Sequence, residues 1–198
     1  MTLELWNTLA TFGTFLVIAA TAIAAIFQLR HARTSNQIAA INELRESMET
    51  PAFAAAQHFV FTELADALKD PELRHQLFNR NARTSANQTM ISKINTVGNH
   101  YEGVGLLIRA GLVDKRSVLE MWSGPCVGSW EALSPATAIF RRQFGSLLWE
   151  NFEYLAVLSQ DWIADHPHGT YPPGMRRLSP EDEWLDADTR YAASLKAR

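Results

Sequence analysis

The sequence predicts an all-α protein in which one N-terminal transmembrane helix continues into a cytoplasmic helical domain. Three observations predict this class. Residues 5–29 contain no Asp, Glu, Lys or Arg. Most later segments repeat apolar residues every three or four positions, which is the period of an α-helix. No segment alternates apolar and polar residues between turn signals, so strands are not expected.

The uncharged run 5–29 is long enough to cross a membrane. As a helix it would extend roughly 37 Å, and the hydrocarbon core of a bilayer is about 30 Å thick. Trp6 suits an aromatic anchor at the interface. A cleaved signal peptide and a buried helix of a soluble protein are the alternatives. A signal peptide favours a basic segment before the apolar core, which is absent, but Ala20-Thr21-Ala22 resembles a cleavage site, so this alternative stays open. The length and uniformity of the run argue against a helix of a soluble protein, which at the surface shows a polar stripe.

Basic residues lie on one side of this run only. Arg30 and Arg33 follow it directly, and no Lys or Arg precedes it. The positive-inside tendency therefore predicts an inner (plasma) membrane location with the N-terminus outside and the following domain in the cytoplasm. Cys126 is the only cysteine, so no intramolecular disulfide can form, which fits a reducing compartment. The lipid bilayer is the first expected partner.

Composition predicts three parts: a transmembrane anchor with its flank (1–33), an all-helical domain (34–166), and a Pro-rich linker with a short C-terminal helix (167–198). With 47% hydrophobic and 20% charged residues, the chain is not wholly disordered. The net charge of −3 and the lack of a further basic cluster give no footprint for nucleic acid, which is not an expected partner.

Local signals place the helices of the domain. The first helix is expected to continue until Pro51, with Ile38, Ile41 and Leu44 on one apolar face that must pack on its own domain or on another chain. Thr50-Pro51 and Asp70-Pro71 predict two helix starts, because each pairs an N-cap residue with proline at the first helical position.

The clearest helix is expected from Ser85 to Gly111. A short helix after Asp114 and a new helix starting at Ser123-Gly124-Pro125 follow, and Pro135 should kink or split the latter. A last long helix is expected to stop near His166-Pro167.

Three motifs carry a family resemblance. They are the segment QLRHARTSNQ after the apolar run, the pair NHYEGVG and RAGLVD at 99–105 and 109–114, and WEALSP at 130–135 followed by Arg141-Arg142. Over about residues 1–165 the chain resembles the domain of unknown function 4760 family. The resemblance implies a single-pass membrane protein of bacterial type. It implies no activity and supplies no catalytic residue.

Glycines inside the best helix mark a candidate functional surface. Gly98, Gly103 and Gly105 each cost about 0.5–1 kcal/mol relative to Ala, so close approach of a helix or of a ligand should offset them. The favoured interpretation is tight packing beside Trp130. The candidate surface consists of Gly98, Tyr101, Glu102, Gly105 and Trp130.

Other chemical patterns are incomplete. Glu72-x-x-His75 has metal-ligand spacing, but a di-iron bundle needs two such pairs and two more glutamates. Cys126 is expected just inside a helix start, which would lower its pKa, yet no base accompanies it, and a small buried side chain is the favoured interpretation. Glu150 and Glu153 are expected to pair with arginines. No catalytic, cofactor-binding or metal-binding residue is assigned, and no cofactor is expected.

Two classes of function follow. The first is a membrane-anchored interaction or scaffold protein, associating as a homo-oligomer or with a protein partner. Ala20 and Ala24 have the small-residue spacing that permits helix pairing in lipid. The alternative is a membrane-tethered hydrolytic enzyme with a site near Tyr101 and Glu102.

Overall fold

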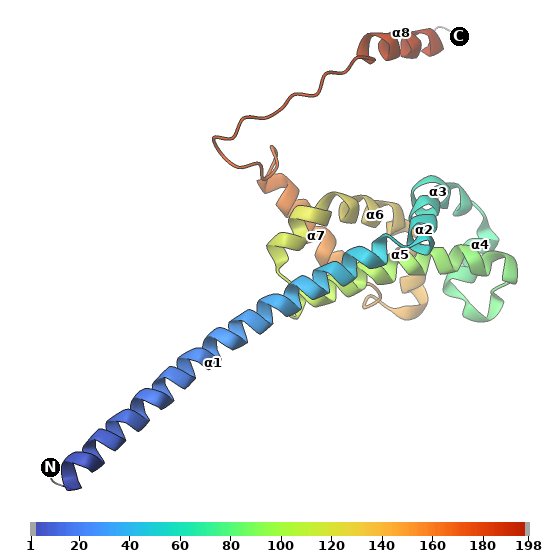
Figure 1. Cartoon of the computed structure of the whole chain (residues 1–198). Helices are drawn as coiled ribbons and strands as arrows, with labels where there is room; N and C mark the ends of the chain where they lie inside the picture. Colours follow the sequence, from blue (N-terminus) through green and yellow to red (C-terminus); the bar gives the residue numbers. More distant parts are fainter. Residues whose placement is uncertain (1–2, 197–198) are drawn as a thin grey trace. The chain divides into compact units, whose positions relative to one another are not determined.

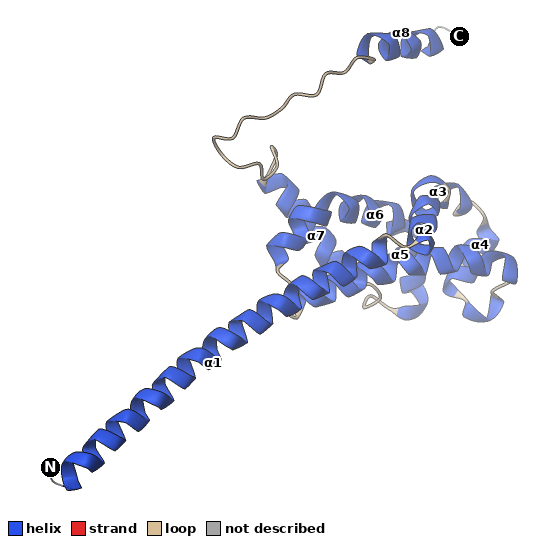
Figure 2. Ribbon diagram, viewed as in Figure 1, coloured by secondary structure: helices blue, strands red, loops and turns tan. Residues whose placement is uncertain are grey.

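The computed structural model describes residues 3–196, and these residues form eight α-helices and one 3₁₀ helix without any strand (Figure 2). The all-α prediction is therefore confirmed. The chain divides into two units, Met1–Pro167 and His168–Arg198. Each unit is described by itself.

Helix α1 (Leu3–Met48) is a single helix of 46 residues. It contains the whole uncharged run and continues without a break into the domain (Figure 1). Its last turns are fastened to the domain, because Ile41, Leu44 and Met48 pack against the core. Ile38 remains 56% exposed. The apolar face predicted after the uncharged run thus lies partly on the protein's own domain.

Six further α-helices complete the first unit. They are α2 (Pro51–Thr62), α3 (Leu64–Ala67), α4 (Pro71–Phe78), α5 (Ser85–Arg109), α6 (Lys115–Phe144) and α7 (Glu150–Asp165), with the 3₁₀ helix η1 (Arg80–Ala82) before α5. Helix α7 packs on both α5 and α6, while α2 packs on α5 and α4 on α6. One continuous cluster of buried side chains joins these helices.

The predicted helix starts at Pro51 and Pro71 are confirmed. Thr50 Oγ1 accepts a hydrogen bond from the Phe53 amide at 3.2 Å, and Asp70 accepts one from the Glu72 amide at 2.9 Å. Each cap satisfies a backbone N–H that has no partner within its helix.

Helix α6 corrects a prediction. It runs for 30 residues through both Pro125 and Pro135, so the helix start predicted at Ser123-Gly124-Pro125 is wrong, and Pro135 does not split the helix. Each proline removes one backbone hydrogen bond. Leu119, Leu133 and Phe140 are buried in the same core on both sides of the prolines, and this packing holds the helix continuous.

The second unit contains α8 (Leu185–Lys196) after an irregular segment. This helix lies within the segment 167–198 for which the sequence predicts a linker and a short C-terminal helix. Asp182 accepts a hydrogen bond from the Trp184 amide at 3.1 Å, in the turn that precedes α8.

Candidate functional site

Two of the three glycines within α5 allow the start of α7 to lie directly on α5. A Cβ at Gly98 would overlap the indole ring of Trp149, and a Cβ at Gly105 would overlap the backbone carbonyl of Asn151. Nothing lies within 4 Å of the Cβ position at Gly103. The close approach predicted from these glycines is present, but Trp149 and Asn151, not Trp130, are the groups that need the space. We call this contact the α5–α7 seam.

Trp149 closes one end of the seam. Its indole Nε1 donates a hydrogen bond to Asn99 Oδ1 at 2.9 Å, and the residue is 3% exposed. Its backbone is left-handed, with φ 55°, at the N-cap position of α7. It is the one described non-glycine residue with positive φ, a conformation that bulky residues adopt only when their surroundings hold them.

Glu102 supplies the cap that Trp149 lacks. Its Oε2 accepts a hydrogen bond from the Phe152 amide at 2.9 Å, and its Oε1 accepts one from Asn151 Nδ2 at 2.7 Å. A carboxylate at a helix N-terminus also interacts favourably with the helix dipole. The Glu102 carboxylate is therefore engaged in holding α7 against α5.

Two arginines bind residues at the start of α7. Arg109 Nη1 donates to Glu150 Oε1 at 3.1 Å and to Asn151 Oδ1 at 3.0 Å. Arg141 donates to the Leu148 carbonyl at 2.9 Å and forms an ion pair with Glu153 at 2.8 Å. The prediction that Glu150 and Glu153 pair with arginines is confirmed.

Tyr101 and Trp130 both pack on Phe152. The Tyr101 ring stacks on Phe152 with centroids 5.0 Å apart, and Trp130 meets it edge-on at the same distance. Tyr101 is 1% exposed, and among the described residues its hydroxyl has no hydrogen-bond partner. Burial raises the pKa of Tyr101 to about 12. This phenol is placed to fill the core, away from solvent.

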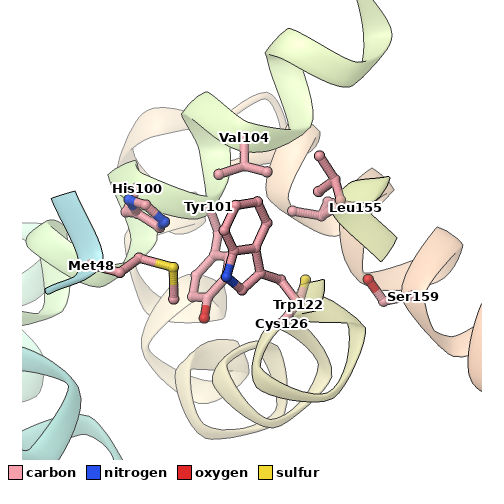
Figure 3. Close-up of a pocket in the computed structure, with 9 residues that line it drawn as sticks. Met48, His100, Tyr101, Val104, Trp122, Cys126, Leu155 and Ser159 are labelled. Carbon is pink, nitrogen blue, oxygen red and sulfur yellow. The ribbon is translucent and has the colours of Figure 1, made fainter. Parts of the chain in front are cut away.

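A small cavity of about 10 Å³ lies beside Tyr101 (Figure 3). It is enclosed chiefly by apolar groups, and it is about the size of one water molecule. The side chains that line it are those of Met48, His100, Tyr101, Val104, Val118, Trp122, Cys126, Leu155 and Ser159. The space is too small for an organic substrate.

His100 joins α1 to this region. Its Nδ1 lies 3.2 Å from Ser47 Oγ, and Phe53 meets its ring edge-on with centroids 4.8 Å apart. Burial lowers the pKa of His100 to about 4. The imidazole is therefore neutral at pH 7.

Cys126 lies in the middle of α6, 1% exposed, and not at a helix N-terminus. Burial raises the pKa of its thiol to about 11. The predicted lowering of this pKa by a helix start is wrong, because that start does not exist. The expectation of a small buried side chain is confirmed.

The Glu72 and His75 pair is used locally on α4. Glu72 Oε1 accepts a hydrogen bond from Gln76 Nε2 at 3.0 Å, and His75 Nε2 lies 3.3 Å from Asn79 Nδ2. No group of three or more His, Cys, Asp or Glu suited to a metal occurs among residues 3–196.

The apolar part of α1 presents a second feature. The most apolar 18-residue stretch of α1 is not buried against the rest of the structure. The helix is long and apolar enough to cross a membrane. Ala20 and Ala24 both lie in this exposed section. Phe15, Val17 and Phe27 are each more than 60% exposed.

These features define a class: an all-α domain carried on one N-terminal helix that is long and apolar enough to span a membrane. A family model described as a domain of unknown function (DUF4760) matches residues 15–162. The chain belongs to the DUF4760 family, as its motifs suggested. The match includes most of the apolar helix together with the α5–α7 seam. No curated protein and no solved structure matches the chain.

Proposed function

We propose that this chain is a single-pass membrane protein of the inner (plasma) membrane, whose helical domain serves as an interaction or scaffold protein in the cytoplasm. One observation carries the membrane part of the proposal. No other described part of the structure covers the most apolar stretch of α1. Water-soluble monomers rarely expose continuous apolar patches above a few hundred Å², so a bilayer is the natural cover for this helix.

The α5–α7 seam argues against the hydrolytic alternative. A hydrolytic site needs an accessible acid or base beside a substrate pocket. The Glu102 carboxylate accepts two hydrogen bonds from the start of α7, and the Tyr101 hydroxyl is buried. The seam is a packed, capped contact between helices rather than a concave site.

Labelling of cysteine variants tests the topology. In a Cys126→Ala background, cysteines at Glu4, which precedes the apolar run, and at Lys69 report the two sides of the membrane, because both residues are exposed. A membrane-impermeant maleimide should label the first in intact cells and the second only after lysis. Labelling of the second in intact cells, or recovery of the chain in the soluble fraction, contradicts the topology.

Crosslinking in native membranes tests the interaction role. We expect discrete crosslinked species that contain this chain and either a second copy or another protein. A monomer alone at every crosslinker length contradicts the scaffold proposal. Turnover of model esters by the purified chain, lost in Glu102→Gln with the fold retained, would favour the hydrolytic alternative instead.

A further inference from the structure

The connection between α5 and α6 presents a leucine to solvent in a fixed conformation. Gly111 has φ 68°, its amide donates to the Ile108 carbonyl at 3.0 Å, and the Leu112 amide donates to the Leu107 carbonyl at 3.0 Å. These two hydrogen bonds form a Schellman motif, which ends α5 and fixes the direction of the chain.

The residues that follow fix the other end of the connection. Val113 is 4% exposed and belongs to the core, and Asp114 accepts a hydrogen bond from the Ser117 amide at 2.8 Å as the N-cap of α6. Leu112 lies between these anchored points, yet it is 58% exposed. A rigid loop therefore holds a large apolar side chain out of the core.

Leu112 lies beside α1 where the apolar run ends. Gly111 and Leu112 share an open groove with Leu29, Ala32 and Arg33 and with the next turn of α1, Asn36 and Gln37. Figure 1 shows the α5–α6 connection beside this part of α1. The hydrocarbon core spans about 30 Å and the headgroups add roughly 5–7 Å on each side. At about 1.5 Å of rise per residue, Ala32 and Arg33 therefore fall at headgroup depth when residues 5–29 span the membrane, and Asn36 and Gln37 lie just outside it.

Four basic residues lie in the two segments next to this leucine. Lys115 and Arg116 occupy the first turn of α6, and Arg30 and Arg33 lie on α1; all four are exposed. Asp114 is the acidic residue within the loop, and its carboxylate is bound to Ser117. An apolar tip flanked by cations matches an anionic bilayer surface, which offers an acyl boundary beneath a layer of phosphates.

We propose that the 111–116 tip, defined as Gly111–Arg116, is a second membrane contact of the domain. Leu112 enters the headgroup layer, and Lys115 and Arg116 bind anionic lipid phosphates. This inference rests on the proposed membrane span of α1. It adds a fixed orientation: the C-terminal end of α5 faces the bilayer, and the α2–α3 end of the domain faces away from it.

Quenching by lipids tests the tip in the full chain. A polarity-sensitive fluorophore is placed on single cysteines at Leu29, Leu112 or Glu63 in the Cys126→Ala background. Glu63 is an exposed residue between α2 and α3 and serves as the matched distal control. The chain is reconstituted in phosphatidylcholine vesicles with or without phosphatidylglycerol, with nitroxide-labelled lipid as the quencher.

We expect strong quenching at positions 29 and 112 and none at position 63. Quenching at 29 with position 112 behaving like 63 overturns the inference and leaves the membrane span intact. Absence of quenching at 29 overturns the span, and the inference with it. Shielding of position 112 from water-soluble iodide without lipid quenching means that a protein covers the tip, which also overturns the inference.

Charge variants test the role of the cations. Each basic side chain at an anionic surface contributes about fivefold to the ratio of bound to free states. The double variant Lys115→Glu/Arg116→Glu should lower quenching at 112 in phosphatidylglycerol vesicles and leave quenching at 29 unchanged. The conservative double variant Lys115→Arg/Arg116→Lys should retain the quenching at position 112. Equal quenching at 112 in both double variants overturns the electrostatic part of the inference.

Discussion

The carboxylate of Glu102, in the middle of α5, accepts a hydrogen bond from the Phe152 amide in the first turn of α7. The residue at the N-cap position of α7, Trp149, makes no side-chain cap of its own. A helix N-terminus has four N–H groups without partners in the helix, and each needs another acceptor when it is not in water. A neighbouring helix therefore supplies what the local sequence lacks.

Removal of this cap should destabilise the domain. Glu102→Ala leaves the buried Phe152 amide and the Asn151 side chain without their acceptor, which costs about 1–3 kcal/mol. Thermal unfolding of the full chain in mild detergent, followed by circular dichroism, measures the loss. Glu131→Ala removes an exposed carboxylate from α6 and should stay within about 0.5 kcal/mol of the parent. Equal stability of both variants would contradict the capping role.

The three glycines of α5 should respond differently to replacement by alanine. Gly98→Ala and Gly105→Ala force a methyl group into the Trp149 ring and the Asn151 backbone, at a cost of about 1–3 kcal/mol each. Gly103→Ala meets no atom and should stabilise α5 by about 0.5–1 kcal/mol. Unfolding curves of the three variants check this order. A destabilising change at Gly103 would show that this position also makes a close contact.

Stability should depend on His100 at acidic pH. Burial lowers its pKa from 6.5 to about 4, so between these values the unfolded chain binds more protons than the folded one. The contribution is complete above pH 6.5 and is lost as the pH falls to about 4, in total about 3 kcal/mol. The His100→Gln variant should lack this part of the pH dependence, whereas variation of the exposed His58 to Gln should keep it. The melting temperature as a function of pH is the measurement.

Cys126 should be inert in the folded chain. Its thiol is buried and its pKa is raised to about 11, so thiolate is scarce at pH 8 and reagents cannot reach the sulfur. Ellman's reagent should react with the thiol only after unfolding by guanidinium chloride. Rapid reaction in the native chain would mean that the core around α6 opens.

If α1 pairs through Ala20 and Ala24, replacing these small residues with larger ones should weaken dimerisation. Ala20→Leu with Ala24→Leu should separate the paired helices and weaken dimerisation about tenfold, because close backbone approach is lost. Ala22→Leu lies on the other side of the helix and serves as the control. Energy transfer between labelled copies in vesicles reports the dimer. An unchanged dimer fraction in the double variant would assign pairing to another surface.

Much of the fold could be predicted from local signals. The starts after Thr50 and Asp70 depend on side chains within three residues of the amides that they cap, so the sequence alone contains the information. The boundary near Gly111 is likewise local, since it depends on one residue with positive φ.

Contacts between distant elements could not be predicted in this way. Glycine spacing indicated that something approaches α5 closely, but the crossing of α5 and α7 decides that Trp149 and Asn151 are the partners. Those residues lie about 50 positions along the chain from their contacts. In α6, prolines that would end an isolated helix are tolerated because the core binds both of its halves.

The unbroken course of α1 has a mechanical consequence. From Leu3 to Met48 the helix contains no proline, and its one glycine, Gly13, precedes the domain by many turns. A helix without a hinge behaves as a rod, and a spanning rod tilts when the bilayer becomes thinner. The last turns of α1 pack on the core through Ile41, Leu44 and Met48. A tilt of α1 would therefore rotate the attached domain relative to the membrane. In the proposed membrane arrangement, bilayer thickness would therefore change the angle between the domain and the membrane wherever the 111–116 tip is not bound to lipid.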